Sequence, residues 1–176
     1  MSQTSSQTSR RLHAVQTLTR SGLLALLRPD KYLRMALTVR REGITTATGI
    51  SLAAVRRPRG RAVVDERGEL TWSELNQRCN ALAAALQGRP GGAPKSVGIL
   101  CRNHRGFIEA LAAAARVGAD ILLLNTAFSG PQLAGVLERE KPDMVIYDEE
   151  FEAVMDQATT NEHRVDRVIA WTDASV

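Results

Sequence analysis

The chain has 176 residues, of which 44% are apolar and 24% charged, a composition typical of a folded globular protein and not of a disordered one. This length suffices for one ordinary domain with a hydrophobic core. No apolar run approaches the roughly 18 residues that span a bilayer, and the first residues lack the apolar stretch of a secretory signal, so we expect a cytoplasmic protein.

The first third of the chain is strongly basic. Residues 1–61 carry twelve Lys or Arg and two Asp or Glu, a net charge of +10, whereas residues 62–176 carry a net charge of −6. We therefore divide the chain into a basic, partly helical N-terminal arm (residues 1–60) and an α/β domain (residues 61–176). A basic arm suits an anionic partner such as lipid headgroups or nucleic acid, or it packs on its own acidic domain.

Three segments of the arm have helical patterning, namely residues 10–27, 32–41 and 45–55. Asp30 is expected to cap the second segment and Gly43 to end it. Two interpretations remain open. In the first, residues 10–45 lie on an anionic membrane at the inner membrane face, with apolar side chains toward lipid and arginines toward headgroups. In the second, the helices cover one side of the domain. No recognition motif accompanies the arginines, so we expect no nucleic-acid partner.

The domain opens with a hairpin and a well-marked helix start. Residues 62–64 and 69–70 are predicted to pair as short strands around a turn at residues 66–68. Thr71 and Glu74 have the spacing of a capping box, with Leu70 and Leu75 as its hydrophobic staple. The helix is expected to end at Gly88.

Residues 96–125 have the pattern strand, helix, strand, and the alternation continues beyond them. Residues 121–124 are apolar on both faces, which is typical of a strand covered by helices in a parallel sheet. Further elements are predicted in the order helix (129–140), strand (144–147), helix (148–157) and strand (168–171). From about residue 61 the chain therefore predicts an α/β fold with a partial doubly wound sheet.

The sequence offers no catalytic constellation. Cys79 and Cys101 lack metal-ligand spacing and are expected to be buried free thiols. His104 follows a strand at its carboxyl end, where a ligand could bind, but we expect a solvated loop histidine, and the acidic residues 148–152 are explained by a solvated first helical turn. The phosphate-loop, nucleophile-elbow and paired-histidine motifs are missing. We predict no catalytic, cofactor-binding or metal-binding residue in this chain.

Three segments taken together resemble the N-terminal part of the AMP-forming acyl-CoA synthetases, within the adenylate-forming (AMP-binding) superfamily. RAVVD (61–65) with LTWSELN (70–76) is similar to the family's opening, "hydrophobic-D … L-T-(Y/W)-x-E-L". VGILCRN (97–103) is similar to its "V-x-I-hydrophobic-x-x-N" strand and turn, and RVGA (116–119) through LN (124–125) to its "G-A-x-x-x-P-L-(N/D)" segment. Leu123 departs from the pattern, because the family often has proline there. The arm loosely resembles the N-terminal extension of the long-chain fatty-acyl type.

The resemblance implies a two-step ligase of fatty acid metabolism. A fatty acid and Mg-ATP would give an acyl-adenylate, and coenzyme A would then displace AMP. The family's phosphate loop, its magnesium, ribose and lysine ligands and its mobile C-terminal domain have no counterpart up to Val176. The resemblance therefore implies a truncated N-terminal α/β subdomain that is inactive alone and binds no ATP, Mg²⁺ or coenzyme A by itself.

Two other classes of function remain open, a non-enzymatic flavodoxin-like binding module and a membrane-recruited scaffold. For the synthetase subdomain, a sheet of about four strands has too few helices to cover both faces unless the basic arm folds back. We therefore expect exposed apolar surface and self-association.

Overall fold

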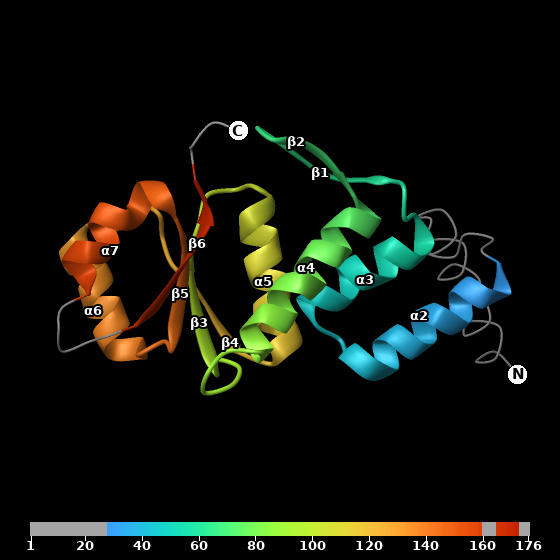
Figure 1. Cartoon of the computed structure of the whole chain (residues 1–176), viewed down its shortest axis with the longest axis horizontal. Coiled ribbons are helices and arrows are strands. Elements are labelled where there is room, and N and C mark those ends of the chain that lie inside the picture. Colours follow the sequence, from blue (N-terminus) through green and yellow to red (C-terminus); the bar gives the residue numbers. More distant parts are fainter. Residues whose placement is uncertain (1–27, 160–164, 173–176) are drawn as a thin grey trace, which may run out of the picture.

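A four-stranded parallel sheet lies at the centre of the molecule, and helices cover both of its faces (Figure 1). This computed structural model describes residues 28–159 and 165–172. The helices and strands follow in the order α2 (Pro29–Glu42), α3 (Thr46–Arg56), β1 (Arg61–Asp65), β2 (Gly68–Thr71), α4 (Trp72–Gln87), β3 (Ser96–Leu100), α5 (Arg105–Val117), β4 (Asp120–Leu123), α6 (Gly130–Glu140), β5 (Met144–Asp148), the short 3-10 helix η1 (Glu149–Phe151), α7 (Glu152–Ala158) and β6 (Asp166–Trp171).

The strand order is β4-β3-β5-β6, and all three pairings in this sheet are parallel. The chain runs outward from β3 to β4 and then returns to β5 on the other side of β3, where Val97 lies opposite both Ile121 and Met144. This reversal defines a doubly wound sheet. The predicted α/β fold with a partial doubly wound sheet is confirmed.

Each face of the central strands packs against its own pair of helices. All five residues of β5 are buried, and alternate side chains point to opposite faces. Met144 and Ile146 pack in a cluster with α4 and α5, whereas Val145 and Tyr147 pack in a cluster with α6 and α7. The expected shortage of covering helices is therefore wrong for the central strands. Among the described residues it holds at the two edge strands, where Leu123 on β4 is 58% exposed and Ile169 on β6 is 42% exposed.

The helix starts follow the capping signals in the sequence. The Thr71 hydroxyl accepts a hydrogen bond from the Glu74 backbone N–H, and the Glu74 carboxylate accepts one from the Thr71 N–H at 2.8 Å. The predicted capping box is confirmed. Gly118 ends α5 in the left-handed region at φ 77°, where a side chain would cost energy.

A third apolar cluster joins the β1–β2 hairpin to the helices beside it. It consists of Ala47, Val63, Leu70, Leu75, Cys79 and Ala112. Cys79 and Cys101 are buried free thiols, as predicted.

The arm is helical where it is described, and it packs through α3. Helices α2 and α3 confirm the second and third predicted helical segments, and Gly43 ends α2 as predicted. The first predicted segment, residues 10–27, lies outside the described residues. The prediction that Asp30 caps α2 is wrong. Pro29, whose fixed φ favours the first helical position, begins the helix, and Asp30 lies in its first turn within 3.6 Å of Arg28.

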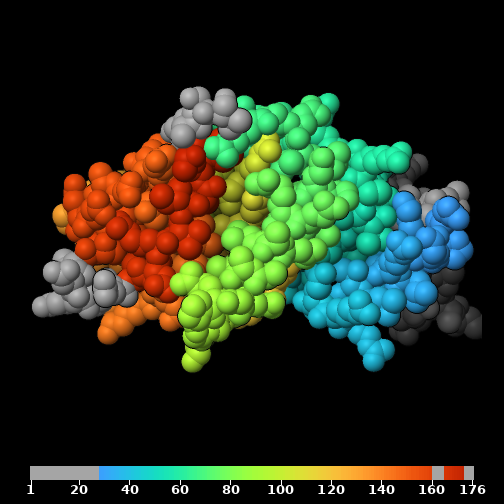
Figure 2. Space-filling model, in the orientation of Figure 1, coloured from blue at the N-terminus to red at the C-terminus, as the bar shows by residue number. Residues whose placement is uncertain are grey.

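A polar network fixes the arm to the domain. The Ser51 hydroxyl on α3 donates to the Glu42 carboxylate on α2 at 2.9 Å. Arg116 on α5 donates to Ser51 at 3.0 Å and to the Asn76 side chain on α4 at 2.6 Å. Helix α2 thereby lies on α3 at one end of the molecule, away from α6 and α7 (Figure 2). No helix among the described residues is both long enough and apolar enough to cross a bilayer.

Candidate functional site

A polar cluster lies where β3, β5 and β6 end, at the carboxyl edge of the sheet. The chain turns toward one face of the sheet after β3 and toward the other after β5. The crevice between the carboxyl ends of two such strands is the position at which open α/β sheets bind ligands. The side chains that occupy this position are His104, Asp148 and Trp171.

His104 is held by both of its ring nitrogens. Its Nδ1 accepts a hydrogen bond from the Gly106 N–H at 3.0 Å, so its Nε2 carries the proton and donates to Asp148 Oδ2 at 2.9 Å. The imidazole also stacks on the Trp171 indole, with ring centroids 4.3 Å apart. The prediction of a solvated loop histidine is wrong, because the His104 side chain is 3% exposed.

Asp148 is equally enclosed, with its side chain 1% exposed. Its Oδ2 also accepts the Arg102 backbone N–H at 2.7 Å. The explanation of this carboxylate as part of a solvated helical turn is therefore wrong, although Glu149, Glu150 and Glu152, which follow it, are exposed.

The hairpin closes over this cluster. Arg67, in the β1–β2 turn, lies 3.8 Å from the centre of the Trp171 ring and donates to the Thr172 carbonyl. The cation–π contact and this hydrogen bond fix the end of β6 against a segment about 100 residues earlier in the chain.

A buried ion pair fixes the same hairpin to the start of α5. The Arg105 guanidinium binds both oxygens of the Asp65 carboxylate, and the Arg105 backbone N–H donates to Oδ2 at 3.0 Å. These hydrogen bonds hold the pKa of Asp65 at about 2, below its ordinary value of 3.8. Only 3% of the Asp65 side chain is exposed. The RAVVD segment singled out in the sequence thus ends in a structural anchor.

The cluster organises the chain and is poorly suited to catalysis. One ring nitrogen of His104 binds the Gly106 N–H at the start of α5 and the other binds Asp148 at the end of β5, so neither nitrogen is free to contact a substrate. Burial raises the pKa of the nearby Cys101 thiol, which suppresses the nucleophilic thiolate. Within the described ranges, no group of three or more His, Cys, Asp or Glu side chains could hold a metal ion.

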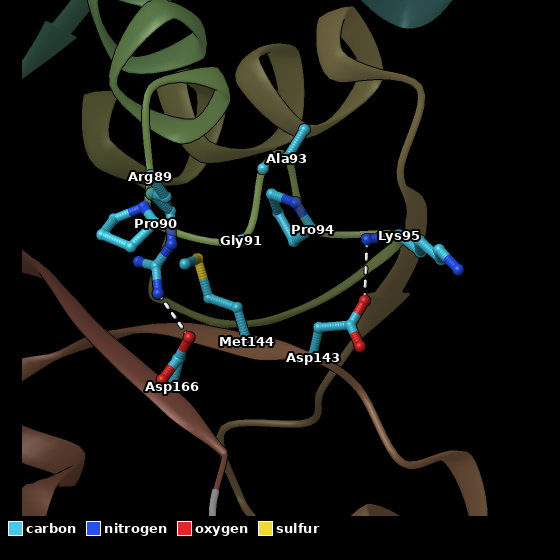
Figure 3. Close-up of a pocket in the computed structure, with 10 residues that line it drawn as sticks. Arg89, Pro90, Gly91, Ala93, Pro94, Lys95, Asp143, Met144 and Asp166 are labelled. Atoms are coloured by element: carbon cyan, nitrogen blue, oxygen red, sulfur yellow. Dashed lines mark hydrogen bonds and ion pairs between the residues drawn. The ribbon is translucent and has the colours of Figure 1, made fainter.

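A hollow lies at the amino edge of the sheet, on the loop between α4 and β3 (Figure 3). It has a volume of about 270 Å³ and is lined by residues 89–95 together with Asp143, Met144 and Asp166. Arg89 pairs with Asp166, and the Lys95 N–H donates to Asp143 at 2.7 Å. The Lys95 ammonium points away from the hollow (Figure 3). These charges tie the loop to the strands, so we assign them no catalytic role.

Sequence reasoning found the anchors of this region only in part. The sequence marked His104 by its place after a strand, but its partner Asp148 is 44 residues away. The local signal for a buried His104 was Gly106, two residues later at the start of a helix, where glycine is otherwise unfavourable. The structure explains this glycine, because a β-carbon there would lie 2.9 Å from the His104 ring.

Comparison with protein families matches residues 50–175 to the family described as AMP-binding enzyme. The acetate/butyrate–CoA ligase AAE7 of Arabidopsis thaliana is 30% identical over 99 residues, which are 56% of this chain and 17% of the ligase. The benzoate–CoA ligase of the same plant is 25% identical over 111 residues, 63% of this chain and 19% of the ligase.

Solved structures of similar enzymes also superpose on this chain. The N-terminal domain of FACL13 from Mycobacterium tuberculosis superposes with a TM-score of 0.62 at 24% identity, over 70% of this chain and 32% of that one, and shows the shared fold. The O-succinylbenzoate CoA synthetase MenE of Bacillus subtilis, solved with AMP, has a TM-score of 0.57 at 25% identity, over 69% of this chain and 30% of that one. The chain thus covers less than a fifth of the two curated relatives and about a third of the two solved chains.

Proposed function

Because the chain belongs to the AMP-binding enzyme family, we propose that it is the N-terminal α/β part of an ATP-dependent acid–CoA ligase, with an arm at residues 1–60 and a subdomain at residues 61–176. The observation that carries this proposal is the family match over residues 50–175, which begins in α3 and runs through the whole parallel sheet. The curated ligases and the synthetase solved with AMP support it.

The reaction proposed for the whole enzyme joins a carboxylic acid to coenzyme A in two steps. ATP and the acid give an acyl-adenylate and pyrophosphate, and the coenzyme A thiol then displaces AMP. We propose fatty acids as the substrates. The putative long-chain-fatty-acid CoA ligase of Rhodopseudomonas palustris, which is 25% identical with a TM-score of 0.58, supports this choice.

The residues of this chain do not fit ATP, Mg²⁺ or coenzyme A by themselves. The crevice at the carboxyl ends of β3 and β5 is filled by His104, Asp148 and Trp171. The 176 residues contain no glycine-rich phosphate loop with a lysine. The chain's proposed contribution is therefore to build and fix the sheet, and we propose no catalytic, cofactor or metal residue in it.

Pyrophosphate exchange tests both parts of the proposal. Purified residues 1–176 should give no acid-dependent exchange of pyrophosphate into ATP with acetate, butyrate, benzoate or fatty acids. A chimera in which residues 50–175 replace the matching segment of FACL13 should give exchange with fatty acids. Exchange by the isolated chain would contradict the proposed inactivity. A folded chimera without exchange would contradict the ligase assignment.

A second proposal concerns location, because helix α2 of the arm presents apolar and basic side chains to solvent. Tyr32, Leu33 and Leu37 are exposed on α2, beside Arg40 and Arg41. We propose a cytoplasmic protein that attaches peripherally to the inner face of a membrane through its arm, a property compatible with a ligase or with a scaffold.

A further inference from the structure

Exposed apolar side chains are concentrated on one short segment of the described chain. Eight large apolar side chains are exposed among the described residues, and five of them lie between residues 32 and 44. They are Tyr32, Leu33, Leu37, Val39 and Ile44. Leu33 is 63% exposed and Ile44, at the turn into α3, is 94% exposed.

Helix α2 turns one half-buried face toward α3. Lys31, Met35, Thr38 and Glu42 are half-buried and follow the i, i+4, i+7, i+11 spacing of one helix face. At the two ends of this face, the Lys31 ammonium donates to the Arg56 carbonyl at 2.9 Å, and the Glu42 carboxylate accepts from Ser51. The rotation of α2 on α3 is therefore fixed, and the apolar side chains are directed outward.

The outer face is also positively charged. Arg40 and Arg41 are exposed on it, and Arg28 precedes the helix. Asp30 lies beside Arg28 and Glu42 points inward to Ser51, so the acidic residues of α2 do not offset Arg40 and Arg41. An outer face that combines apolar and arginine side chains complements the surface of a lipid bilayer, where anionic headgroups lie above apolar acyl chains.

We propose that the outer face of α2 (Leu33, Leu37, Val39, Arg40 and Arg41), with Ile44 at its end, docks on an anionic lipid bilayer. The helix lies in the plane of the surface, with its leucines among the acyl chains and its arginines at the headgroup phosphates. Because α2 is at one end of the molecule (Figure 2), this orientation leaves the sheet and its carboxyl edge away from the bilayer. The inference rests on the proposed membrane attachment and not on the ligase reaction.

Vesicle co-sedimentation with the full chain tests the proposal without ATP, so its failure is distinguishable from failure of the ligase assignment. Vesicles of 70% phosphatidylcholine and 30% phosphatidylserine should bind the chain, and phosphatidylcholine alone should bind it at least tenfold more weakly. Raising NaCl from 0.1 to 0.5 M should weaken binding to the anionic vesicles, since salt screens exposed charges.

Two double variants separate the apolar and basic contributions. Leu33→Ser with Leu37→Ser, and Arg40→Gln with Arg41→Gln, should each lower the partition coefficient at least tenfold. Leu123→Ser, whose native side chain is exposed to a similar degree on β4, and Arg139→Gln on α6 are the matched controls and should bind as the parent does. Unchanged binding by the double leucine variant would overturn the proposal.

A tryptophan in place of Leu33 keeps the test valid if the serine variant does not fold. After subtraction of the parent spectrum, its emission should shift to shorter wavelength on anionic vesicles and should be quenched by brominated lipid. Emission that is already shifted without vesicles would show that another part of the chain covers this face. A dimer that dissociates in the Leu33→Ser, Leu37→Ser variant would assign the face to a second copy. Either result would overturn the proposal.

Discussion

Gly106 is the residue at which the start of α5 meets the end of β6. A β-carbon there would lie 2.9 Å from the His104 ring and 3.2 Å from the Ala170 carbonyl oxygen, and the latter is backbone that cannot rotate away. We expect Gly106→Ala to lower the free energy of unfolding by about 1–3 kcal/mol, because overpacking displaces the imidazole that accepts the Gly106 N–H.

Gly135→Ala is the matched control for this variant. Gly135 is also in a helix, α6, and a β-carbon there would have no neighbour within 4 Å. Its replacement should stabilise the protein by up to about 1 kcal/mol through helix propensity. Urea unfolding of the two variants should therefore give changes of opposite sign. A neutral Gly106→Ala would mean that the contacts of His104 are looser than described.

Asp65 should make the stability of the fold sensitive to acid. Its pKa is about 2 in the folded protein and near 3.8 when it is unpaired, so the carboxylate form favours folding. The resulting stabilisation is present above about pH 4 and is lost as the pH falls toward 2. By the linkage relation it amounts to about 2 kcal/mol.

The comparison that isolates this contribution uses Asp65→Asn. This variant should be less stable than the parent at pH 6, because the buried Arg105 loses its anion. Its free energy of unfolding should also fall less steeply than that of the parent between pH 5 and pH 2.5. Parallel pH profiles would show that other carboxylates cause the acid sensitivity.

At the scale of elements, the start of α4 depends on one threonine. We expect Thr71→Ala to destabilise the protein by about 1 kcal/mol, because the Glu74 backbone N–H loses its acceptor at the helix N-terminus. Ser73→Ala, two residues along, is the control, since no hydrogen bond of its hydroxyl is found among the described residues. In thermal unfolding, Thr71→Ala should have a lower Tm than the parent, and Ser73→Ala should have nearly the same Tm as the parent.

The elements themselves were largely predictable because their signals are local. The box at Thr71 and Glu74, the glycine after α5 and the apolar run of β5 each lie within a few residues of the structure they specify. Pro29 at the first position of α2 is a local signal too, and it marks a helix start one residue before Asp30, the residue that we expected to be the cap.

The polar cluster was not predictable by the same means. His104 meets Asp148 across 44 residues and Asp65 meets Arg105 across 40, and no periodicity encodes such pairs. The burial of the apolar strands also depended on contacts between distant parts of the chain. Residues 121–124 are as apolar as residues 144–147, yet their exposure depends on strand order, which placed β4 at an edge of the sheet and β5 in its interior.

At the scale of the whole molecule, the central strands are covered, and the large exposed apolar side chains of the described residues lie on α2 and the turn after it, on the hairpin and on the edge strands of the sheet. Strand β4 pairs with β3 on one side only in the part of the chain that is described, and it exposes Leu123. An apolar edge strand with free backbone groups favours pairing with another chain. We therefore expect the isolated protein to enhance the fluorescence of a hydrophobic dye and to self-associate through β4.

Leu123→Lys tests this expectation, because a charge on an edge strand opposes pairing between copies. Sedimentation velocity should show a smaller associated fraction for this variant than for the parent. Val64→Lys is the matched control, since Val64 is 60% exposed but lies in the hairpin and not at the edge of the parallel sheet. The leucine-to-serine changes on α2 should leave association unchanged while lowering dye binding. If Val64→Lys reduced association as much as Leu123→Lys, the contact would depend on general apolar exposure and not on the open edge of β4.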